Sequence, residues 1–183
     1  MATTTIDMND DHKPVTKGML RAWLVKFGIP DDRIFEPPAE EIGKAPQDIR
    51  PVLESMLIVP YKYSVNKTED ENTMLFEAKI TILRKWINVK LMIIRSTEIP
   101  KKLRLPLYEK LLKGNFDLNE VTFSLSQPGD VFVEADLPVG TDYYNFESEY
   151  GSVEFGVDYF LSEIVATLNE ISVIDTFQAD LYI

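Results

Sequence analysis

The chain has 183 residues and no cysteine, which excludes disulfide bonds, thiolate metal sites and a cysteine nucleophile. Hydrophobic residues make up 45% of it, enough to bury one core of single-domain size. No apolar run is long enough to cross a membrane, and residues 1–11 lack the basic and apolar regions of a signal peptide. We therefore expect a cytoplasmic protein with no membrane partner.

The net charge of −11 is unevenly distributed along the chain. Between Lys79 and Lys113 there are ten basic and two acidic residues, whereas fourteen carboxylates and no basic residue follow Lys113. The two blocks could face each other within the fold or across a dimer, or the acidic block could recruit a basic partner. The overall negative charge argues against nucleic acid as a ligand.

The N-terminal part of the chain changes from polar to amphipathic to proline-rich. Residues 1–16 are polar, hold the lone histidine, His12, and are expected to form a disordered tail. Residues 17–27 carry apolar side chains at helical spacing, and Gly28 is placed as a helix stop. Five prolines in residues 29–51 exclude a long helix there. We expect this segment to cross the domain surface, either as a fixed crossing or as a mobile lid.

Three consecutive strands are predicted next, from their alternating apolar and polar residues and their β-branched and aromatic content. We place them at residues 56–66, 74–83 and 86–95. Pro60 favours an edge strand or a bulge for the first of them. Residues 91–94 are apolar in succession, so both faces of the third strand could be covered at its end. Leu91 and Ile93 are therefore our candidates for a subunit interface.

A short helix and a hairpin are predicted after the three strands. The helix covers residues 105–113, with Pro106 at its first position and Gly114 at its end. The tetrapeptide Gln-Pro-Gly-Asp is typical of a tight turn and joins strands predicted at 121–125 and 131–135.

A long amphipathic helix is expected from Gly151 to Phe177. Its apolar stripe recurs at intervals of three and four residues: Val153, Val157, Phe160, Ile164, Leu168 and Ile171. Ser152 is the expected N-cap, and Glu154 and Asp158 suit the positive end of the helix dipole. We expect the apolar face of this helix to pack against a β-sheet.

The predicted fold is therefore of the α+β class. Residues 17–178 are expected to form one domain, an antiparallel five-stranded sheet packed by helices in the order α-β-β-β-α-β-β-α. Residues 179–183 are expected to be a short C-terminal tail.

An acidic, aromatic loop is predicted at residues 141–150, before the long helix. Its aromatic residues could pack over the end of the sheet, or they could form a contact patch for a basic, apolar peptide. The candidate contact patch consists of Tyr143, Tyr144, Phe146, Tyr150 and Phe155.

Catalytic signatures are scarce. With one histidine the chain cannot form a Ser-His-Asp triad or a His-metal cluster, and it has no glycine-rich phosphate loop. The carboxylates of residues 142–158, with Glu154 and Asp158 one helical turn apart, could hold Ca²⁺ or act as an acid–base pair. We favour an acidic surface without a catalytic role, and we predict no catalytic residue, no metal site and no cofactor.

A family resemblance rests on the element order and on three segments. They are Leu105–Phe116 (LPLYEKLLKGNF), the turn Pro128-Gly129-Asp130, and Val133–Pro138 (VEADLP). Together they resemble the YbjN family, whose fold is similar to that of type III secretion chaperones, over residues 17–177. The resemblance implies a non-enzymatic protein, because those chaperones are acidic homodimers that bind unfolded segments of partner proteins through apolar patches and strand addition. It implies no individual site residue.

The leading functional hypothesis is therefore a chaperone- or adaptor-like protein-binding module, a homodimer that binds a partner protein or peptide. One alternative is a metal-dependent hydrolase that uses the carboxylates of residues 142–158. A second alternative is a regulatory protein that binds an anionic ligand through the basic segment 79–113.

Overall fold

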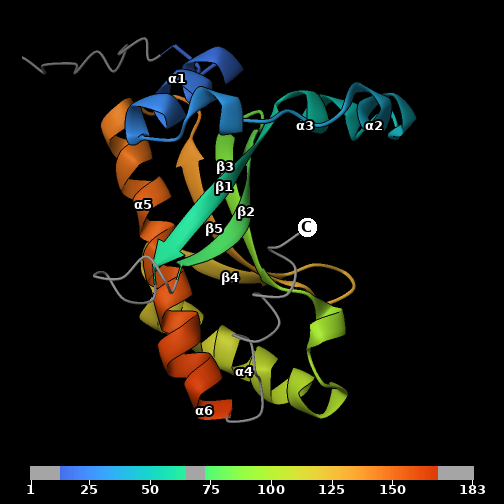
Figure 1. Ribbon diagram of the computed structural model, residues 1–183, viewed down its shortest axis with the longest axis vertical. Coiled ribbons are helices and arrows are strands. Elements are labelled where there is room, and N and C mark those ends of the chain that lie inside the picture. The colour runs from blue at the N-terminus through green and yellow to red at the C-terminus, as the bar shows by residue number, and fades with distance from the viewer. Residues whose placement is uncertain (1–12, 65–72, 169–183) are drawn as a thin grey trace, which may run out of the picture.

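A computed structural model describes residues 13–64 and 73–168 as one antiparallel sheet with helices packed against it (Figure 1). The strands are β1 (Met56–Ser64), β2 (Thr73–Ile82), β3 (Trp86–Ile94), β4 (Thr122–Leu125) and β5 (Val131–Pro138), in the spatial order β1-β2-β3-β5-β4. The helices are α1 (Lys17–Phe27), α2 (Ala39–Lys44), α3 (Arg50–Glu54), α4 (Lys101–Asp117), α5 (Tyr143–Tyr159) and α6 (Ala166–Leu168). The predicted α+β class with a five-stranded antiparallel sheet is confirmed.

Some predictions concern residues outside the described ranges. They are the tail before residue 13, with His12, the end of the first predicted strand at 65–66, the continuation of the last helix beyond Leu168, and the tail at 179–183.

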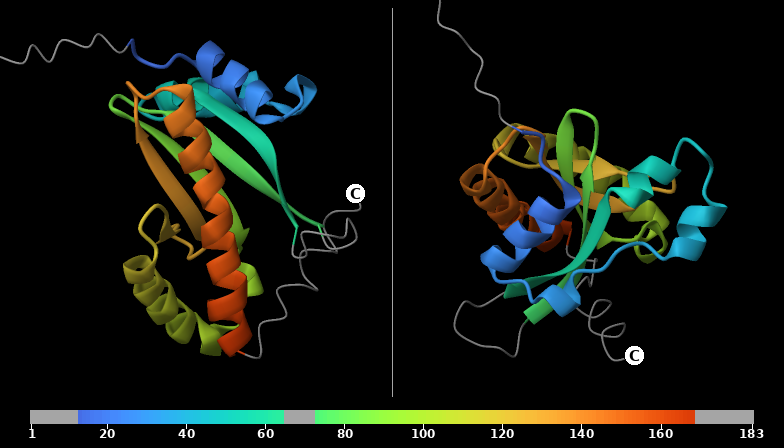
Figure 2. Two further views of the ribbon diagram at one scale, coloured as in Figure 1. Left: turned by 90° about the vertical axis from the view of Figure 1, so that its left-hand side faces the viewer. Right: turned by 90° about the horizontal axis from the view of Figure 1, so that it is seen from above.

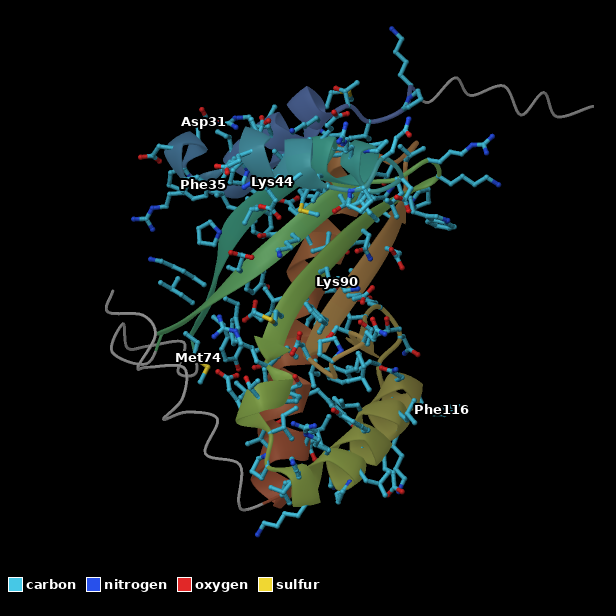
Figure 3. The ribbon with its side chains drawn as sticks, turned by 90° about the vertical axis from the view of Figure 1, so that its right-hand side faces the viewer. Asp31, Phe35, Lys44, Met74, Lys90 and Phe116 are labelled. Carbon is cyan, nitrogen blue, oxygen red and sulfur yellow. The ribbon has the colours of Figure 1, made fainter. Side chains whose placement is uncertain are left out.

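One face of the sheet forms the core. A row of paired residues crosses all five strands on that face and is buried throughout: Val59, Ala78, Leu91, Val133 and Phe123. Helix α5 runs along this face, with α1 against its first turns and α4 near its far end (Figure 2). The opposite face is not covered by α5, and Lys90 lies near its middle (Figure 3).

The two interface candidates on β3 lie in this core. Leu91 pairs with Val133 in the core row, Ile93 lies where the register shifts between Met92 and Ile94, and both Leu91 and Ile93 are fully buried. Their side chains are therefore not on the surface of a single chain. The other face of β3 carries Trp86, Lys90 and Met92.

Helix α5 begins eight residues earlier than predicted, because residues 143–150 are its first turns and not a loop. Asp142 is the N-cap, and its carboxylate accepts a hydrogen bond from the Asn145 N–H at 2.9 Å. Ser152 is a buried residue inside the helix, whose hydroxyl donates to the Glu149 carbonyl. Beyond Tyr159 the chain continues as a π-helical segment, η4 (Phe160–Val165), and then as α6.

Helix α4 is also longer than predicted, and Pro106 lies inside it and not at its first position. Proline removes one intrahelical hydrogen bond there, and α4 is held by the packing of its inner side chains Leu107 and Leu111. Gly114 does not end the helix. It is buried where α4 meets η4, and a Cβ atom on it would lie 2.8 Å from the Tyr159 ring.

Helix α1 follows its prediction, but residues 13–16 do not belong to a disordered tail, because Val15 is buried and its N–H donates to the Val139 carbonyl at 2.8 Å. Thr16 caps α1, and Gly28 ends it in a left-handed conformation with φ of 113°. The proline-rich crossing contains a 3₁₀ turn, η1 (Asp31–Arg33), and the short helices α2 and α3, which lie apart from α5 beyond the sheet (Figure 1). Phe35 in this crossing forms a β-bridge with Ile58.

Candidate functional site

A groove of about 500 Å³ lies where the end of α1, the strand β1 and the middle of α5 meet. We call it the β1 groove. It is lined by Phe27, Gly28, Ile29, Pro30 and Arg33 from α1 and the turn after it, by Pro60, Tyr61 and Lys62 from β1, and by Tyr150, Gly151 and Glu154 from α5. Apolar and aromatic side chains with a few polar groups are the usual lining of a binding site.

Aromatic rings form the wall and the floor of the β1 groove. The Tyr150 ring packs edge-on against Phe27, with centroids 4.9 Å apart, and against Tyr61, at 5.6 Å. It also stacks on Phe146 at 5.5 Å. Gly28 turns the chain at the end of α1, so that Phe27 remains at the rim and partly exposed.

The hydroxyl group of Tyr150 has no hydrogen-bond partner within the part of the chain that the structure describes. The residue is 1% exposed, and its burial raises the pKa of this hydroxyl, followed by the influence of Tyr61. The group therefore stays protonated at neutral pH and is an unused donor. A buried, unsatisfied hydroxyl is unfavourable, and because its oxygen is shielded from solvent, Tyr150 offers the groove its ring and not its hydroxyl.

The carboxylates of residues 142–158 make separate interactions and do not gather at one site. Asp142 caps α5, Glu147 accepts a hydrogen bond from Tyr143 at 2.9 Å, and Asp158 accepts one from Tyr63 of β1. Glu154 alone among them lines the groove. Over the described ranges no group of three His, Cys, Asp or Glu side chains could hold a metal ion.

Strand β1 is an edge strand, as Pro60 predicted. Its outward peptide groups include those of Ile58, which exchanges two hydrogen bonds with Phe35 at 2.8 and 2.9 Å. Because the direction alternates along a strand, the peptide groups of Pro60 and Lys62 also point outward. No backbone partner for them is found among residues 13–64 and 73–168.

The structure divides the predicted aromatic contact patch into three parts. Phe146 and Tyr150 are buried, and Tyr150 reaches the β1 groove. Tyr143 is half-buried, beside Trp23 and below the Lys26 ammonium group, which lies 3.6 Å from its ring. Tyr144 and Phe155 are 74% and 62% exposed. Eleven residues apart, they lie on the same side of α5.

The groove residues on α1 and β1 were not among the sequence candidates. Phe27, Tyr61 and Lys62 belong to segments whose local patterns indicate only a helix end and a strand. The one relevant signal was Pro60, which marked the edge of the sheet beside which the groove opens.

The basic segment 79–113 is distributed over two surfaces. Lys79 and Lys90 lie on the open face of the sheet, and Lys90 forms an ion pair with Glu134 at 2.6 Å. The other members near its end belong to α4. Across the described ranges, no helix combines the length and the apolar character needed to cross a bilayer.

Comparison with known proteins finds matches among solved structures. A scan against family models and a search of the curated proteins find no match. Among solved structures, the fold is similar to that of YbjN. That crystal structure, of a candidate transcription regulator from E. coli, matches with a TM-score of 0.47 and 18% identity, over 81% of this chain and 96% of YbjN. YbjN is the protein whose family the sequence segments resemble, and the low identity transfers no residue role from it to this chain.

Proposed function

We propose that the protein is a non-enzymatic, adaptor- or chaperone-like module that binds an extended peptide segment of a partner protein. The segment would add to the outer edge of β1 and place one apolar side chain in the β1 groove. The observation that carries the proposal is that Pro60, Tyr61 and Lys62 belong to both features, the edge and the groove.

The edge of β1 has the hydrogen-bonding groups that strand addition needs. Phe35 already pairs with this edge at Ile58, but the pairing is an isolated bridge. Beyond it the edge presents the carbonyl of Pro60 and both backbone groups of Lys62. A peptide strand that continues from the bridge would satisfy them, and such main-chain bonds supply affinity with little dependence on peptide sequence.

The β1 groove would supply the preference for particular side chains. Its rings from Phe27, Tyr61 and Tyr150 would bury an apolar side chain of the peptide, and burial of that area favours binding. Peptides with an aliphatic or aromatic residue at one position are therefore the expected ligands.

The proposal is tested at Lys62, where a proline and an alanine have different effects. Lys62→Pro removes the outward N–H without disturbing the pairing with β2, whereas Lys62→Ala removes the charge and keeps the N–H. The probe is a set of peptides selected from a random phage-displayed library on the wild-type protein. We expect Lys62→Pro to weaken their binding at least about tenfold and Lys62→Ala less than about twofold, as measured by fluorescence anisotropy.

Two outcomes would contradict the proposal. One is a selection in which no peptide is enriched over a control surface. The other is equal binding of the selected peptides to the wild type and to Lys62→Pro, with circular dichroism melts showing that both are folded.

A further inference from the structure

Helix α4 carries an apolar stripe on the side that faces away from the fold. Leu105, Leu112 and Phe116 are 68%, 67% and 91% exposed. Their spacings of seven and four residues place them on one side of the helix. The side chain of Phe116 projects from α4 away from the sheet (Figure 3). Exposed side chains of this size, gathered in one row, mark an interaction surface and not ordinary surface scatter.

The inner side of α4 packs against the rest of the fold. Leu107, Leu111 and Gly114 are buried against the fold, and a Cβ atom at Gly114 would contact the rings of Tyr159 and Phe123. The exposed stripe is therefore held on a rigid helix that is anchored from behind. A partner that binds it would not need to order the helix first.

The charge around the stripe is basic. Helix α4 has five basic side chains and two acidic ones, and Arg104 and Asp117 are among those engaged within the fold. Arg104 donates to the Ser96 carbonyl at 2.8 Å, and Asp117 accepts from the Tyr159 hydroxyl at 2.6 Å. Exposed Lys101 and Lys113 flank the stripe.

One acidic residue, Glu109, lies exposed between Leu105 and Leu112. It is four residues before Lys113, a spacing at which opposite charges on a helix attract. Because its charge is opposite to that of its surroundings, Glu109 should oppose an acidic ligand and can be used to test the sign of the surface.

We propose that this α4 surface binds an acidic amphipathic helix of a partner protein, at a site separate from the β1 groove. The stripe spans twelve residues, about 16 Å along the axis, which matches about three turns of a second helix packed alongside. Acidic residues beside the apolar row of that helix would meet Lys101 and Lys113. The protein would then hold an extended peptide at β1 and a helix at α4, as an adaptor does.

A lipid surface is the less suitable occupant. A basic helix with leucine and phenylalanine can lie on an anionic membrane, but the whole chain has a net charge of −11 and would be repelled by one. An acidic helix is small enough to contact α4 alone, so it is attracted by the local charge and largely avoids the repulsion.

The test uses a designed peptide of about 18 residues, with leucine in its apolar row and glutamate beside it, and a twin with lysine in place of glutamate. Binding of each fluorescent peptide to the full-length protein is followed by anisotropy. We expect the acidic peptide to bind, Phe116→Ala and Lys113→Glu each to weaken it about tenfold, and Glu109→Gln to strengthen it. Phe155→Ala is the matched control, because it removes an exposed phenylalanine from a different helix. It should change peptide binding by less than about twofold.

The proposal is overturned if the acidic peptide does not bind, or if the lysine twin binds equally well. It is also overturned if Phe116→Ala leaves peptide binding unchanged but abolishes binding to phosphatidylcholine vesicles that contain phosphatidylserine. A mass that falls from dimer to monomer in Phe116→Ala would assign the surface to a second copy of the chain instead. Because all four substitutions are at exposed positions, circular dichroism should show unchanged folding in each.

Discussion

Three tyrosine hydroxyls around α5 differ in what they bind. Tyr63 donates to Asp158 and Tyr159 donates to Asp117, and the bond to Asp117 raises the pKa of Tyr159 to about 12. The hydroxyl of Tyr150 lies at the β1 groove and has no partner within the described ranges. The first two hydroxyls tie elements together, whereas the third is buried without a partner.

This difference predicts opposite effects of the same substitution. Tyr150→Phe removes an unsatisfied hydroxyl and should raise the free energy of unfolding by about 1 kcal/mol. In the wild type this hydroxyl gives up its hydrogen bonds to water on folding and gains none in return, and the variant avoids that cost. Tyr159→Phe removes a satisfied hydroxyl and should lower it by about 1 kcal/mol. Urea unfolding measures both changes.

The same Tyr150→Phe variant should bind the peptides selected for the β1 groove as tightly as the wild type, because it keeps the ring that lines the groove and the hydroxyl oxygen is buried. Weaker peptide binding by Tyr150→Phe would contradict this expectation, and a loss of stability would mean that the hydroxyl is satisfied by water.

Glu134 is the centre of a polar cluster on the open face of the sheet. It pairs with Lys90 and accepts hydrogen bonds from Ser124 and Asn88. Burial by itself would raise the pKa of Glu134, but these partners outweigh it and hold the pKa below the ordinary value of 4.5. The cluster joins β3, β5 and β4 across the sheet.

The lowered pKa predicts how stability depends on pH. The stabilisation from Glu134 is complete above pH 4.5 and is lost as the pH falls through the lowered pKa, since protonation breaks the pairing with Lys90. Glu134→Gln should therefore be less stable than the wild type at pH 7, and the difference should shrink below about pH 4. Melting temperatures measured across this range check the prediction, and a difference that is independent of pH would contradict it.

At the scale of elements, the close approach of α5 to the sheet depends on one residue. A Cβ atom at Gly156 would lie 2.6 Å from a methyl group of Val133 and 3.1 Å from Val121. At Gly151, in the same helix, a Cβ atom would have nothing within 4 Å. Both glycines are in helical conformation, so they differ only in their surroundings.

Alanine substitutions at these two positions should therefore change the free energy of unfolding in opposite directions. Gly156→Ala overpacks the interface with β5 and should destabilise the fold by about 1–3 kcal/mol, in spite of alanine's better helix propensity. Gly151→Ala gains that propensity without a clash and should stabilise by about 0.5–1 kcal/mol. Thermal or urea unfolding measures both, and a stabilised Gly156→Ala would show that α5 can move away from the sheet at little cost.

At the scale of the whole molecule, the two charged blocks of the sequence lie mainly on different surfaces. Lys90 and Glu134 connect them across the sheet. Most of the remaining basic side chains are on α4, and the acidic ones continue along α5. The molecule thus has a basic, apolar surface and an acidic, aromatic one, which suits partners of opposite kinds.

The homodimer expected from the sequence remains a prediction at this scale. Light scattering at micromolar concentration should give twice the chain mass of 21.0 kDa. Because charged surfaces contribute to association, the apparent mass should also be measured at high salt. A monomer under all these conditions would contradict the prediction, and it would leave the peptide-binding proposal, which uses one chain only, unaffected.

The sequence by itself determined the order of the strands and of the longer helices, and the two faces of each strand. It did not determine the short helices α2 and α3. Alternation in residues 74–83, the turn before Val131 and the stop at Gly28 are properties of neighbouring residues, so they could be predicted without knowledge of the fold. Helix starts were less certain, since α5 and α4 both extend upstream of their first clear apolar repeat. Pro60 was informative because proline has no N–H to donate to a neighbouring strand, which restricts it to an edge strand or a bulge in any fold.

Only the tertiary structure decided which aromatic and apolar residues are available to a partner. Tyr150 and Phe155 look equivalent in the sequence, as do Leu107 and Leu112, yet in each pair the first is buried and the second exposed. Burial depends on what distant segments place against a side chain, and that is not encoded in its local pattern. The unpaired Tyr150 hydroxyl and the exposed stripe of α4 arise in the same way, from packing between elements far apart in the chain.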